Sequence, residues 1–542
     1  MMIGGWALLA VFVLASWTRI TTDKTWRGWA LLLTLGFSLL HQLLYSTVAD
    51  DAFITFRYAR NIAEGYGPVF NPGDHVEGYP AFLWLVIVSL PKVLFGWDIV
   101  VTAVVFGIIA ALGSVLLTYF VVSRIVGDAR QSDDDSPQAL GVLAAVLTAA
   151  AGGLAAYGGS GLETSLYVFI LIAVVYALAA HRPVIAGVLA TLATMTRPEG
   201  VFVVFVAGLW LLYSAVRKRT SWWAPAGYLL GALVFAVPRA AWRETFYGHL
   251  LPNVVVAKIG GPLGWLLEAG FRYLSGFSLA HLGFLLLGVA TVGMLLRNRA
   301  ANPHEARGRS LVWFALALVA AQLVLVVLTA GTDSSPAWRL FAPIPPLLAV
   351  AACAAFGVVT SARPIRAVPA VAVVLAGAAV VASALSPHML TAMHDWRTQT
   401  AEREQLGDWL RDRLAPGTVI AVYSSGAVAY HVGMSILVID VLGVTDDHIA
   451  HQGTRTEASN YLPTDFEYVV NRRPALALAT TEAYTPSQHC AIDPSYAPQY
   501  GVATYKRLDT GKWVTLYLRG DQYQTLNAQL SADDRYQFVP CP

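Results

Sequence analysis

Long apolar runs separated by short polar segments fill most of the chain up to about residue 386. A helix needs about 20 apolar residues to cross the roughly 30 Å hydrocarbon core of a bilayer. Many of the runs approach this length, so the pattern predicts a polytopic α-helical membrane protein. The apolar runs lie at residues 3–18, 28–48, 80–97, 99–122, 139–156, 164–180, 184–196, 200–216, 222–241, 277–296, 310–330, 344–360 and 367–386.

The connections between these runs differ in their content of Lys and Arg. One set holds 15 Lys and Arg in about 50 residues, and the other holds 8 in about 108. Short basic loops stay on the cytoplasmic side of a membrane, so the second set is expected outside. The basic set is 19–27, 123–138, 181–183, 217–219, 297–309 and 361–366, and the outer set is 49–98, 157–163, 197–199, 242–276 and 331–343.

The run at 80–97 conflicts with this assignment if it crosses, because residues 123–138 would then face outside. It contains Pro91 and Lys92 and has tryptophans towards both ends, a composition typical of a helix at the membrane interface. Without it about 11–12 spans remain, the lower number applying if 3–18 does not cross. With the higher number both termini lie outside.

The run at 184–196 is short for a span and stops at Arg197-Pro198-Glu199-Gly200. Non-helical backbone below the membrane surface persists only inside protein or beside a water-filled cavity. We therefore expect Arg197 and Glu199 to line a pocket in the outer leaflet. The alternative is a re-aligned helix pair in which Arg197 reaches to the interface.

Composition changes near residue 387, which divides the chain into a transmembrane domain (1–386) and a polar C-terminal domain (387–542). Alternating runs predict strands, and residues 402–414 predict a helix, so the second domain is expected to be a small extracytoplasmic α/β domain, a candidate for glycan binding. The predicted strands are 418–423, 435–441, 476–480 and 512–518.

The chain has three cysteines, and their positions differ in kind. Cys353 lies inside an apolar run and is expected to be packing. Cys490 and Cys541 lie in the polar domain, where an oxidising compartment would permit a disulfide; two separate thiols are the alternative.

The charge and composition narrow the range of partners. The chain is 56% hydrophobic and 13% charged, with a formal net charge of +2. No basic patch interleaved with aromatic residues is present, so a nucleic-acid partner is not expected. The lipid bilayer is the expected environment.

The first outer loop, 49–98, begins with adjacent carboxylates, Asp50 and Asp51, where the run at 28–48 ends. Neighbours on a helix point about 100° apart, so one can act as a base while the other caps, orients or binds a cation. A nearby carboxylate and partial burial both raise a pKa, which suits a general base. Asp50 or Asp51 is thus expected to be catalytic; the alternative is a helix-terminal charge cluster.

Charges of both signs recur on the other outer loops, whereas the inner loops are only basic. Arg and Lys suit phosphate, and carboxylates suit sugar hydroxyls or a metal ion. Simpler interpretations are an interfacial anchor for Lys258, a satisfied loop histidine for His249 and a helix cap for Asp333. The candidates for binding a donor phosphate or sugar are Arg57, Arg60, Glu163, Arg197, Glu199, His249, Asn253, Lys258, Asp333 and Arg339.

Several motifs of soluble enzymes are absent from the sequence: a Walker loop, a dinucleotide-binding GxGxxG, HExxH and CxxC. A site on the outer side has no access to cytoplasmic nucleotides. Its donor is therefore expected to be presented in the membrane, and a polyprenyl-phosphate sugar fits that requirement.

The stretch DDAFITFRYARNIAEGYGPVFNPGDHVEGY resembles the first outer loop of the GT-C superfamily of polyprenyl-phosphate-sugar transferases. The segments GLETSLY, TRPEG, FYGHLLPNVVVAK, RLFAPIPPLL and VIDVLGVTDDHIAH are similar to the branch of mycobacterial arabinofuranosyltransferases of the terminal-capping type. The resemblance covers most of residues 28–450. It implies a GT-C-like fold, an interfacial helix pair in the first outer loop, and inverting single displacement with a first-loop Asp as base.

The leading hypothesis is therefore a glycosyltransferase of a bacterial plasma membrane, with an extracytoplasmic site. It would use decaprenyl-phosphate arabinofuranose to glycosylate a cell-envelope glycan. No cofactor is required by this scheme, although a divalent cation stays open. The alternatives are a mannosyltransferase or other-sugar transferase of the same fold, a flippase for a lipid-linked sugar, and a membrane-anchored glycan-binding protein.

Overall fold

The computed structural model describes residues 2–131, 136–329, 333, 335–360, 367–385, 387–423 and 425–542. The basic segment predicted at 361–366 lies outside the described residues. The same is true of part of the outer loop predicted at 331–343.

The chain forms two compact units that do not follow chain order. The first comprises Met1–Thr47, Ala103–Trp242 and Leu263–Met393, and the second comprises Val48–Thr102, Arg243–Pro262 and His394–Pro542. The boundary near residue 393 lies close to the change of composition at 387. Composition alone, however, gave no sign that residues 48–102 and 243–262 pack with the C-terminal part.

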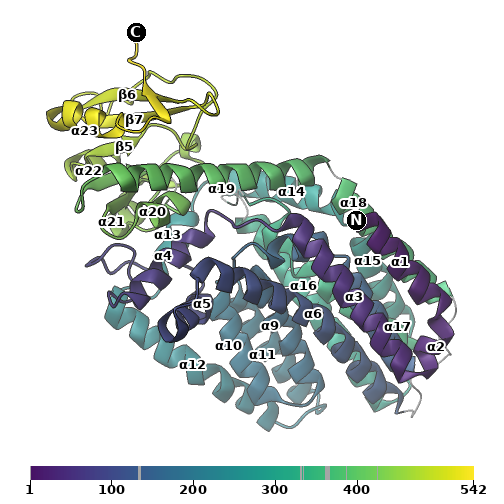
Figure 1. The fold of residues 1–542 in the computed structure, drawn as a ribbon. Coiled ribbons are helices and arrows are strands. Elements are labelled where there is room, and N and C mark those ends of the chain that lie inside the picture. The colour runs from purple at the N-terminus through teal and green to yellow at the C-terminus, as the bar shows by residue number, and fades with distance from the viewer. Residues whose placement is uncertain are drawn as a thin grey trace. The chain divides into compact units, whose positions relative to one another are not determined.

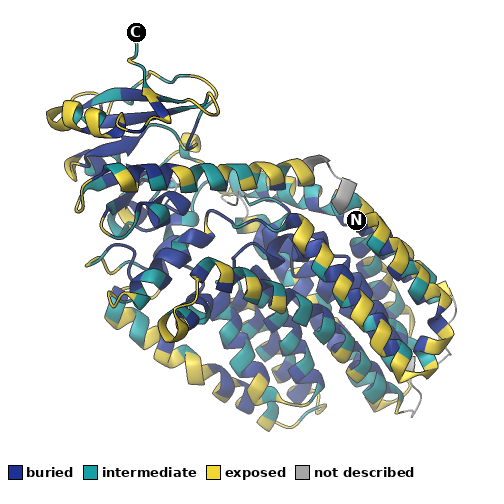
Figure 2. Ribbon diagram, viewed as in Figure 1, coloured by how far each residue is buried: buried dark blue, intermediate teal, exposed yellow. Residues whose placement is uncertain are grey.

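The first unit is entirely helical over its described residues (Figure 1). Its central helices, α9 and α17, are buried along most of their length, whereas α12 exposes Leu229, Leu230 and Val234 (Figure 2). Exposed apolar faces of this kind suit contact with lipid. The helices are α1 (Met2–Ala15), α2 (Trp17–Thr22), α3 (Lys24–Tyr45), α6 (Ile99–Arg130), α7 (Ser136–Ala149), α8 (Gly152–Gly158), α9 (Thr164–Ala179), α10 (Pro183–Thr196), α11 (Gly200–Val216), α12 (Trp223–Tyr247), α14 (Leu263–Ala280), α15 (Leu282–Arg297), α16 (Pro303–Thr329), η2 (Arg339–Phe341), α17 (Ile344–Val359) and α18 (Ala367–Leu385).

Among the described residues, five helices are long and apolar enough to cross a membrane, and up to seven spans result if each of two bent pairs counts as one span. Six shorter apolar helices accompany them, among them α9, α10 and α11. The protein is thus a multi-pass membrane protein. The predicted number of 11–12 spans requires most of the shorter helices to cross the membrane as well, and it stays a prediction.

Two predicted spans are broken helices. The run at 139–156 forms α7 and α8, which meet at 67°, and the run at 277–296 is split between α14 and α15, which meet at 91°. The break between α7 and α8 is fully buried at Ala150 and Ala151, as irregular backbone inside a membrane requires. Within the predicted outer segment 242–276, the residues from Leu263 onwards form part of α14, whose apolar pattern is interrupted by Glu268 and Arg272.

The second unit contains a six-stranded sheet of order β2–β1–β5–β7–β6–β8. β2, β1 and β5 are parallel, and β7, β6 and β8 follow as antiparallel neighbours. The α/β architecture expected for the C-terminal domain is confirmed. The strands are β1 (Val419–Val422), β2 (Leu437–Asp440), β5 (Leu476–Leu478), β6 (Tyr500–Arg507), β7 (Trp513–Arg519) and β8 (Tyr536–Phe538), and β3 (Thr454–Arg455) pairs separately with β4 (Pro463–Thr464).

Helices from three separate parts of the chain complete the second unit. α4 and α5 come from the first outer loop, α13 from the loop at 243–262, and the others from the C-terminal part. α5 is 14 residues long and was predicted to lie at the interface; it falls outside the helices that pass the length test for a span. The helices are α4 (Ala52–Ala63), α5 (Phe82–Phe95), α13 (Asn253–Lys258), α19 (Pro387–Arg413), α20 (Ala427–Val432), α21 (Asp447–Gln452), α22 (Phe466–Asn471) and α23 (Tyr523–Leu530).

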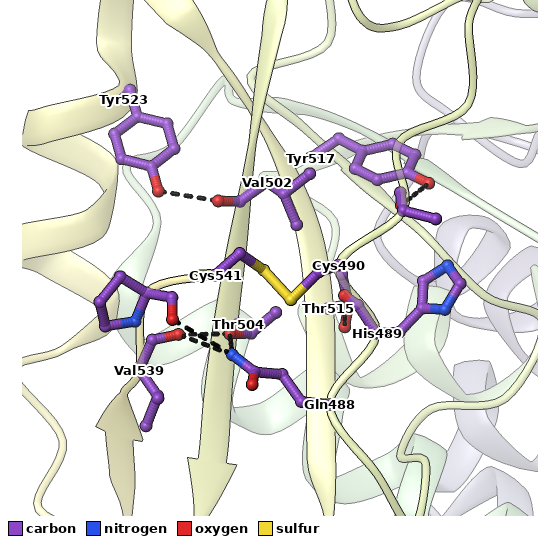
Figure 3. The surroundings of a disulfide bond; sticks show 12 residues. Gln488, His489, Cys490, Val502, Thr504, Thr515, Tyr517, Tyr523, Val539 and Cys541 are labelled. Carbon is purple, nitrogen blue, oxygen red and sulfur yellow. Dashed lines mark hydrogen bonds between the residues drawn. A yellow bond between two sulfur atoms is a disulfide. The ribbon is translucent and has the colours of Figure 1, made fainter.

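Cys490 and Cys541 form a disulfide that joins the loop before β6 to the chain end (Figure 3). Of the two possibilities that the sequence left open, a disulfide and two separate thiols, the disulfide is the one observed. Gln488 lies beside it and donates to Thr504 Oγ1 and to the backbone oxygen of Val539, so the last residues are also held by hydrogen bonds. Cys353 is buried and unbridged.

We expect Cys490→Ser to destabilise the second unit, because the bridge closes a loop with a sequence separation of 51. Loop-closure entropy for such a loop is worth about 4 kcal/mol. Thermal unfolding of the detergent-solubilised protein with and without reductant measures the effect. Cys353→Ala is the control and should keep the wild-type response to reductant; an unchanged melting temperature in the Cys490→Ser variant would contradict the expectation.

Candidate functional site

The two carboxylates at the start of the first outer loop have different surroundings. Asp50 is 5% exposed; its Oδ1 accepts a hydrogen bond from the Ala427 backbone N–H at 2.9 Å, and its Oδ2 lies 3.2 Å from Nη1 of Arg403. The Asp51 side chain is 46% exposed, and its Oδ2 lies 3.7 Å from Nζ of Lys258. Asp50 is therefore bound within the protein, whereas Asp51 is open to a ligand.

Close backbone packing holds Asp50 in this position. A Cβ atom added to Gly426 would lie 2.2 Å from the carbonyl oxygen of Asp50. Such a distance cannot be accommodated against backbone, so the absence of a side chain at Gly426 lets the two segments meet. The contact brings the N–H of Ala427 within reach of the Asp50 carboxylate.

Arg57, predicted to bind a phosphate, is instead fully buried. Its guanidinium donates to the backbone oxygens of Phe70, Gly433 and Ile436 at 2.9–3.0 Å, and it also donates to Ala429 and to the side chain of Asn71. Burial lowers the pKa of Arg57 to about 9, so it stays charged at neutral pH. These contacts occupy the donors that a phosphate would need, and the role of Arg57 here is structural.

Arg60 also contacts the C-terminal part of the second unit. Its Nη1 donates to the backbone oxygen of Tyr430 at 2.9 Å, and its guanidinium lies 3.6 Å from the centre of the Tyr430 ring. Cation–π stacking of this kind contributes about 0.5–2 kcal/mol. Arg60 is only partly buried, whereas Arg57 is fully buried.

Asn253 joins the outer segment predicted at 242–276 to the turn after β2. Its Nδ2 donates to the backbone oxygens of Gly443, Val444 and Asp446 at 2.8–3.2 Å, and the side chain is buried. Asn253 thus holds the start of α13 in place. At the other end of α13 is Lys258, the partner of Asp51.

The sequence analysis did not single out Glu77 and Asp440, two buried carboxylates of the second unit. Glu77 is buried against Arg243, with Oε2 and Nε 2.7 Å apart. Asp440, at the end of β2, accepts from the backbone N–H groups of Leu442 and Thr445 and from the hydroxyl of Ser425. Both carboxylates fix loops that lead to the predicted site residues. The one feature of the sequence that pointed to them is that each lies in a segment that carries the family resemblance.

Burial raises the pKa of Asp440 to about 6, against the hydrogen bonds that lower it. The folded state therefore binds a proton between about pH 4 and pH 6 that the unfolded state releases, so stability falls as pH rises through this window.

The first unit contains a separate buried charge cluster. Nη1 of Arg197 and Nη2 of Arg339 each lie 2.8 Å from Oε1 of Glu163, and Nη2 of Arg197 lies 2.8 Å from Oε1 of Glu199. Four of the predicted donor-binding residues thus come together. Their two positive and two negative charges balance, so the arginines are paired with carboxylates.

Asp333 is connected through Tyr273 to the backbone next to Arg339, a member of the buried charge cluster. Its Oδ2 accepts from the hydroxyl of Tyr273 at 3.1 Å, and that hydroxyl accepts from the backbone N–H of Leu340, next to Arg339. Asp333 therefore contacts Tyr273, which sequence reasoning did not single out.

His249 lies in the second unit beside Asp447 and His451 of α21. Asp447 and His451 occur in the segment VIDVLGVTDDHIAH, which carries part of the family resemblance; the sequence alone assigned neither residue a role.

A cavity of about 960 Å³ in the first unit is lined by basic side chains of the predicted inner loops, among them Arg124, Lys218, Arg219 and Arg307. None of the predicted site residues lines it.

Comparison with known proteins adds to this geometry. The family DUF8728, a domain of unknown function, matches residues 391–524. A terminal β-(1→2)-arabinofuranosyltransferase of Corynebacterium glutamicum is 26% identical over 261 residues, covering 43% of this chain and 35% of the relative. One from Mycobacterium tuberculosis is 27% identical over 286 residues, covering 48% and 42%. The alignments thus span less than half the length of these curated relatives.

Among solved structures, ArnT from Cupriavidus metallidurans in the apo state is similar, with a TM-score of 0.56 and 14% identity over 90% of this chain and 98% of that one. The same protein bound to undecaprenyl phosphate has a TM-score of 0.52, with 15% identity and the same coverage. These comparisons confirm the GT-C-like fold and the resemblance to the arabinofuranosyltransferase branch.

We expect Glu163→Gln to destabilise the protein by about 3–5 kcal/mol, because it leaves the two buried arginines with Glu199 as the one remaining carboxylate of the cluster. Thermal unfolding in detergent measures this. Glu268→Gln removes an exposed pair with Arg272 in the same unit and should change stability by no more than about 0.5 kcal/mol. Equal melting temperatures for the two variants would show that the buried cluster is not stabilising.

Asp440→Asn should flatten the pH dependence of stability between about pH 4 and pH 6. The raised pKa of Asp440 corresponds to a change on the order of 3 kcal/mol across this window in the wild type. Melting temperatures of both proteins over this range check the expectation. Parallel curves would assign the dependence to other groups.

Proposed function

We propose that this protein is a membrane glycosyltransferase that moves a sugar from a polyprenyl-phosphate donor to a hydroxyl of a cell-envelope glycan. The observation that carries the proposal is the exposed carboxylate of Asp51 beside Lys258, at the start of the first outer loop. The same loop carries the resemblance to polyprenyl-phosphate-sugar transferases.

Asp51 is the proposed general base. Its carboxylate takes the proton of the acceptor hydroxyl while the hydroxyl oxygen attacks the anomeric carbon of the donor. The bond from that carbon to the phosphate oxygen breaks, and the electron pair leaves with the polyprenyl phosphate. A single displacement inverts the anomeric centre, and since the leaving group is a stable anion, no strong general acid is required.

Lys258 is the proposed contact for the charge that develops on the phosphate. An ammonium group next to the reacting centre stabilises this charge in the transition state. Asp50 has a positioning role, because its ion pair with Arg403 and its hydrogen bond from Ala427 fix the backbone that carries Asp51. The sequence alone left the choice between Asp50 and Asp51 open, and their exposure favours Asp51.

The cluster of Glu163, Arg197, Glu199 and Arg339 remains a second set of candidates for donor contact. Its charges are balanced within the protein, so a phosphate would have to displace a carboxylate from an arginine. Contact with sugar hydroxyls through Glu163 or Glu199 would require no such exchange, so these two carboxylates are the alternative candidates for donor contact within the first unit.

The finer assignments rest on the relatives. The undecaprenyl phosphate bound to ArnT supports a polyprenyl-phosphate donor, and the names of the curated relatives support arabinofuranose as the sugar. The Cys490–Cys541 disulfide supports an oxidising location for the second unit. We therefore place the site and the C-terminal domain on the outer side of a bacterial plasma membrane, with that domain holding the acceptor glycan.

Asp51→Asn should lower kcat for glycosyl transfer by about 10²–10⁴-fold, the usual contribution of a general base, while donor affinity changes little. The assay follows transfer of pentose from a decaprenyl-phosphate donor to an arabinan oligosaccharide by the purified protein. Asp74→Asn is the matched control, since Asp74 is an exposed carboxylate of the same loop, and it should retain wild-type turnover.

Full turnover of the Asp51→Asn variant would overturn the base assignment. Transport of the lipid by the wild type in vesicles without any glycosyl transfer would favour a flippase. Mass spectrometry of lipid that co-purifies with the protein separates the sugars, because a phosphohexose in place of a phosphopentose would favour a mannosyltransferase or a similar enzyme.

A further inference from the structure

Two histidines converge on one carboxylate in the second unit. Nε2 of His249 lies 3.1 Å from Oδ1 of Asp447, and Nδ1 of His451 lies 3.3 Å from the same oxygen. The two imidazole rings are stacked, with their centres 4.7 Å apart and an angle of 21° between them. The three residues offer ligand atoms that all lie within 4.8 Å of one another.

We propose that His249, Asp447 and His451 bind a divalent transition metal ion of the Zn²⁺ class. Bonds from Zn²⁺ to nitrogen and oxygen are about 2.0–2.2 Å long, so two ligands of a tetrahedral ion lie roughly 3.4 Å apart. The observed separations of 3.1 and 3.3 Å are close to this value, and an ion can enter with small side-chain movements.

The donor set selects the class of metal. Imidazole nitrogens favour Zn²⁺ and similar ions, whereas Ca²⁺ and Mg²⁺ prefer sites built from oxygen. Three protein ligands leave one position of a tetrahedral ion open. The side chains are between one-third and one-half exposed, so water or an oxygen of a ligand can reach this position.

Other histidine–carboxylate pairs in this unit lack the second imidazole. Nε2 of His448 lies 3.0 Å from Asp465, and its ring stacks on Tyr468. Nδ1 of His431 lies 3.1 Å from Asp408. Across the described residues, the set of His249, Asp447 and His451 is the one group of three that meets the geometric requirement for a metal.

The backbone holds both sides of the cluster. Asp446 caps α21 by accepting from the N–H of Ile449 at 3.0 Å, which fixes the first turn that carries Asp447. Nδ1 of His451 also lies 3.0 Å from the backbone oxygen of Asp447, a contact that binding of an ion through Nδ1 would replace. Nη1 of Arg243 donates to the oxygen of Leu250 at 2.9 Å and steadies the loop of His249.

A bound ion would join the loop at 248–252 to α21. These elements flank α13, which packs on α21 and ends at Lys258. The metal would therefore stabilise the part of the second unit that carries Lys258. The inference does not depend on the proposed transferase activity, because binding can be measured without any substrate.

The test is zinc binding by the full-length protein in detergent, purified through a tag without histidines and stripped with EDTA. Titration with Zn²⁺ and mass-spectrometric metal analysis should give one tightly bound equivalent for the wild type. His249→Ala and His451→Ala should each weaken binding at least tenfold. Co²⁺ titration should give visible absorption bands of a tetrahedral ion, and both variants should lose them.

His448→Ala is the matched control, because it removes a paired histidine of the same helix outside the cluster, and it should bind zinc as the wild type does. Asp447→Asn provides a variant of nearly unchanged size if an alanine variant fails to fold, and it should also bind more weakly. Absence of a bound equivalent in the wild type, or equal affinity in wild type and His451→Ala, would overturn the proposal. The Asp51→Asn transfer assay is a separate measurement, so failure of one proposal is distinguishable from failure of the other.

Discussion

The arrangement of the second unit depends on the buried guanidinium of Arg57. A charge placed out of water is costly unless it is fully hydrogen-bonded. Arg57 meets this condition by donating to backbone oxygens around β2 and α20 as well as to Phe70 of its own loop. The first outer loop is therefore joined to the C-terminal domain through main-chain atoms, and the position of α4 follows from it.

This constraint explains how two adjacent carboxylates acquire different surroundings. With α4 held by Arg57 and Arg60, the start of the helix lies against Gly426, and Asp50 enters the protein. Asp51 is the next residue, so its side chain points in another direction and stays in contact with solvent. Asp50 and Asp51 form the turn that precedes α4, and the fixed contact of Asp50 with Gly426 leaves one acid buried and the next exposed.

The sequence predicted elements better than it predicted partners. Apolar runs indicated the helices, and alternation indicated β1, β2, β5 and β7, because both periodicities are local. Strands β3, β4, β6 and β8 were missed; the short β3 and β4 have two residues each, and burial along β6 does not alternate regularly. Arg57, Arg197 and Arg339 were assigned to a ligand from their charge, but the structure pairs them with carbonyls or carboxylates far along the chain. Asp447 and His451 became candidates only when folding brought them beside His249.

The contacts of Asp50 also set an order in which the protein is completed during synthesis. The N–H group that binds its carboxylate belongs to a residue 377 positions later. At about 5–20 residues per second, that partner is made tens of seconds after the first outer loop. Until then the Asp50 carboxylate lacks the hydrogen bond from Ala427. The proposed catalytic surface of the first outer loop is thus completed only after the helices of the first unit have been synthesised.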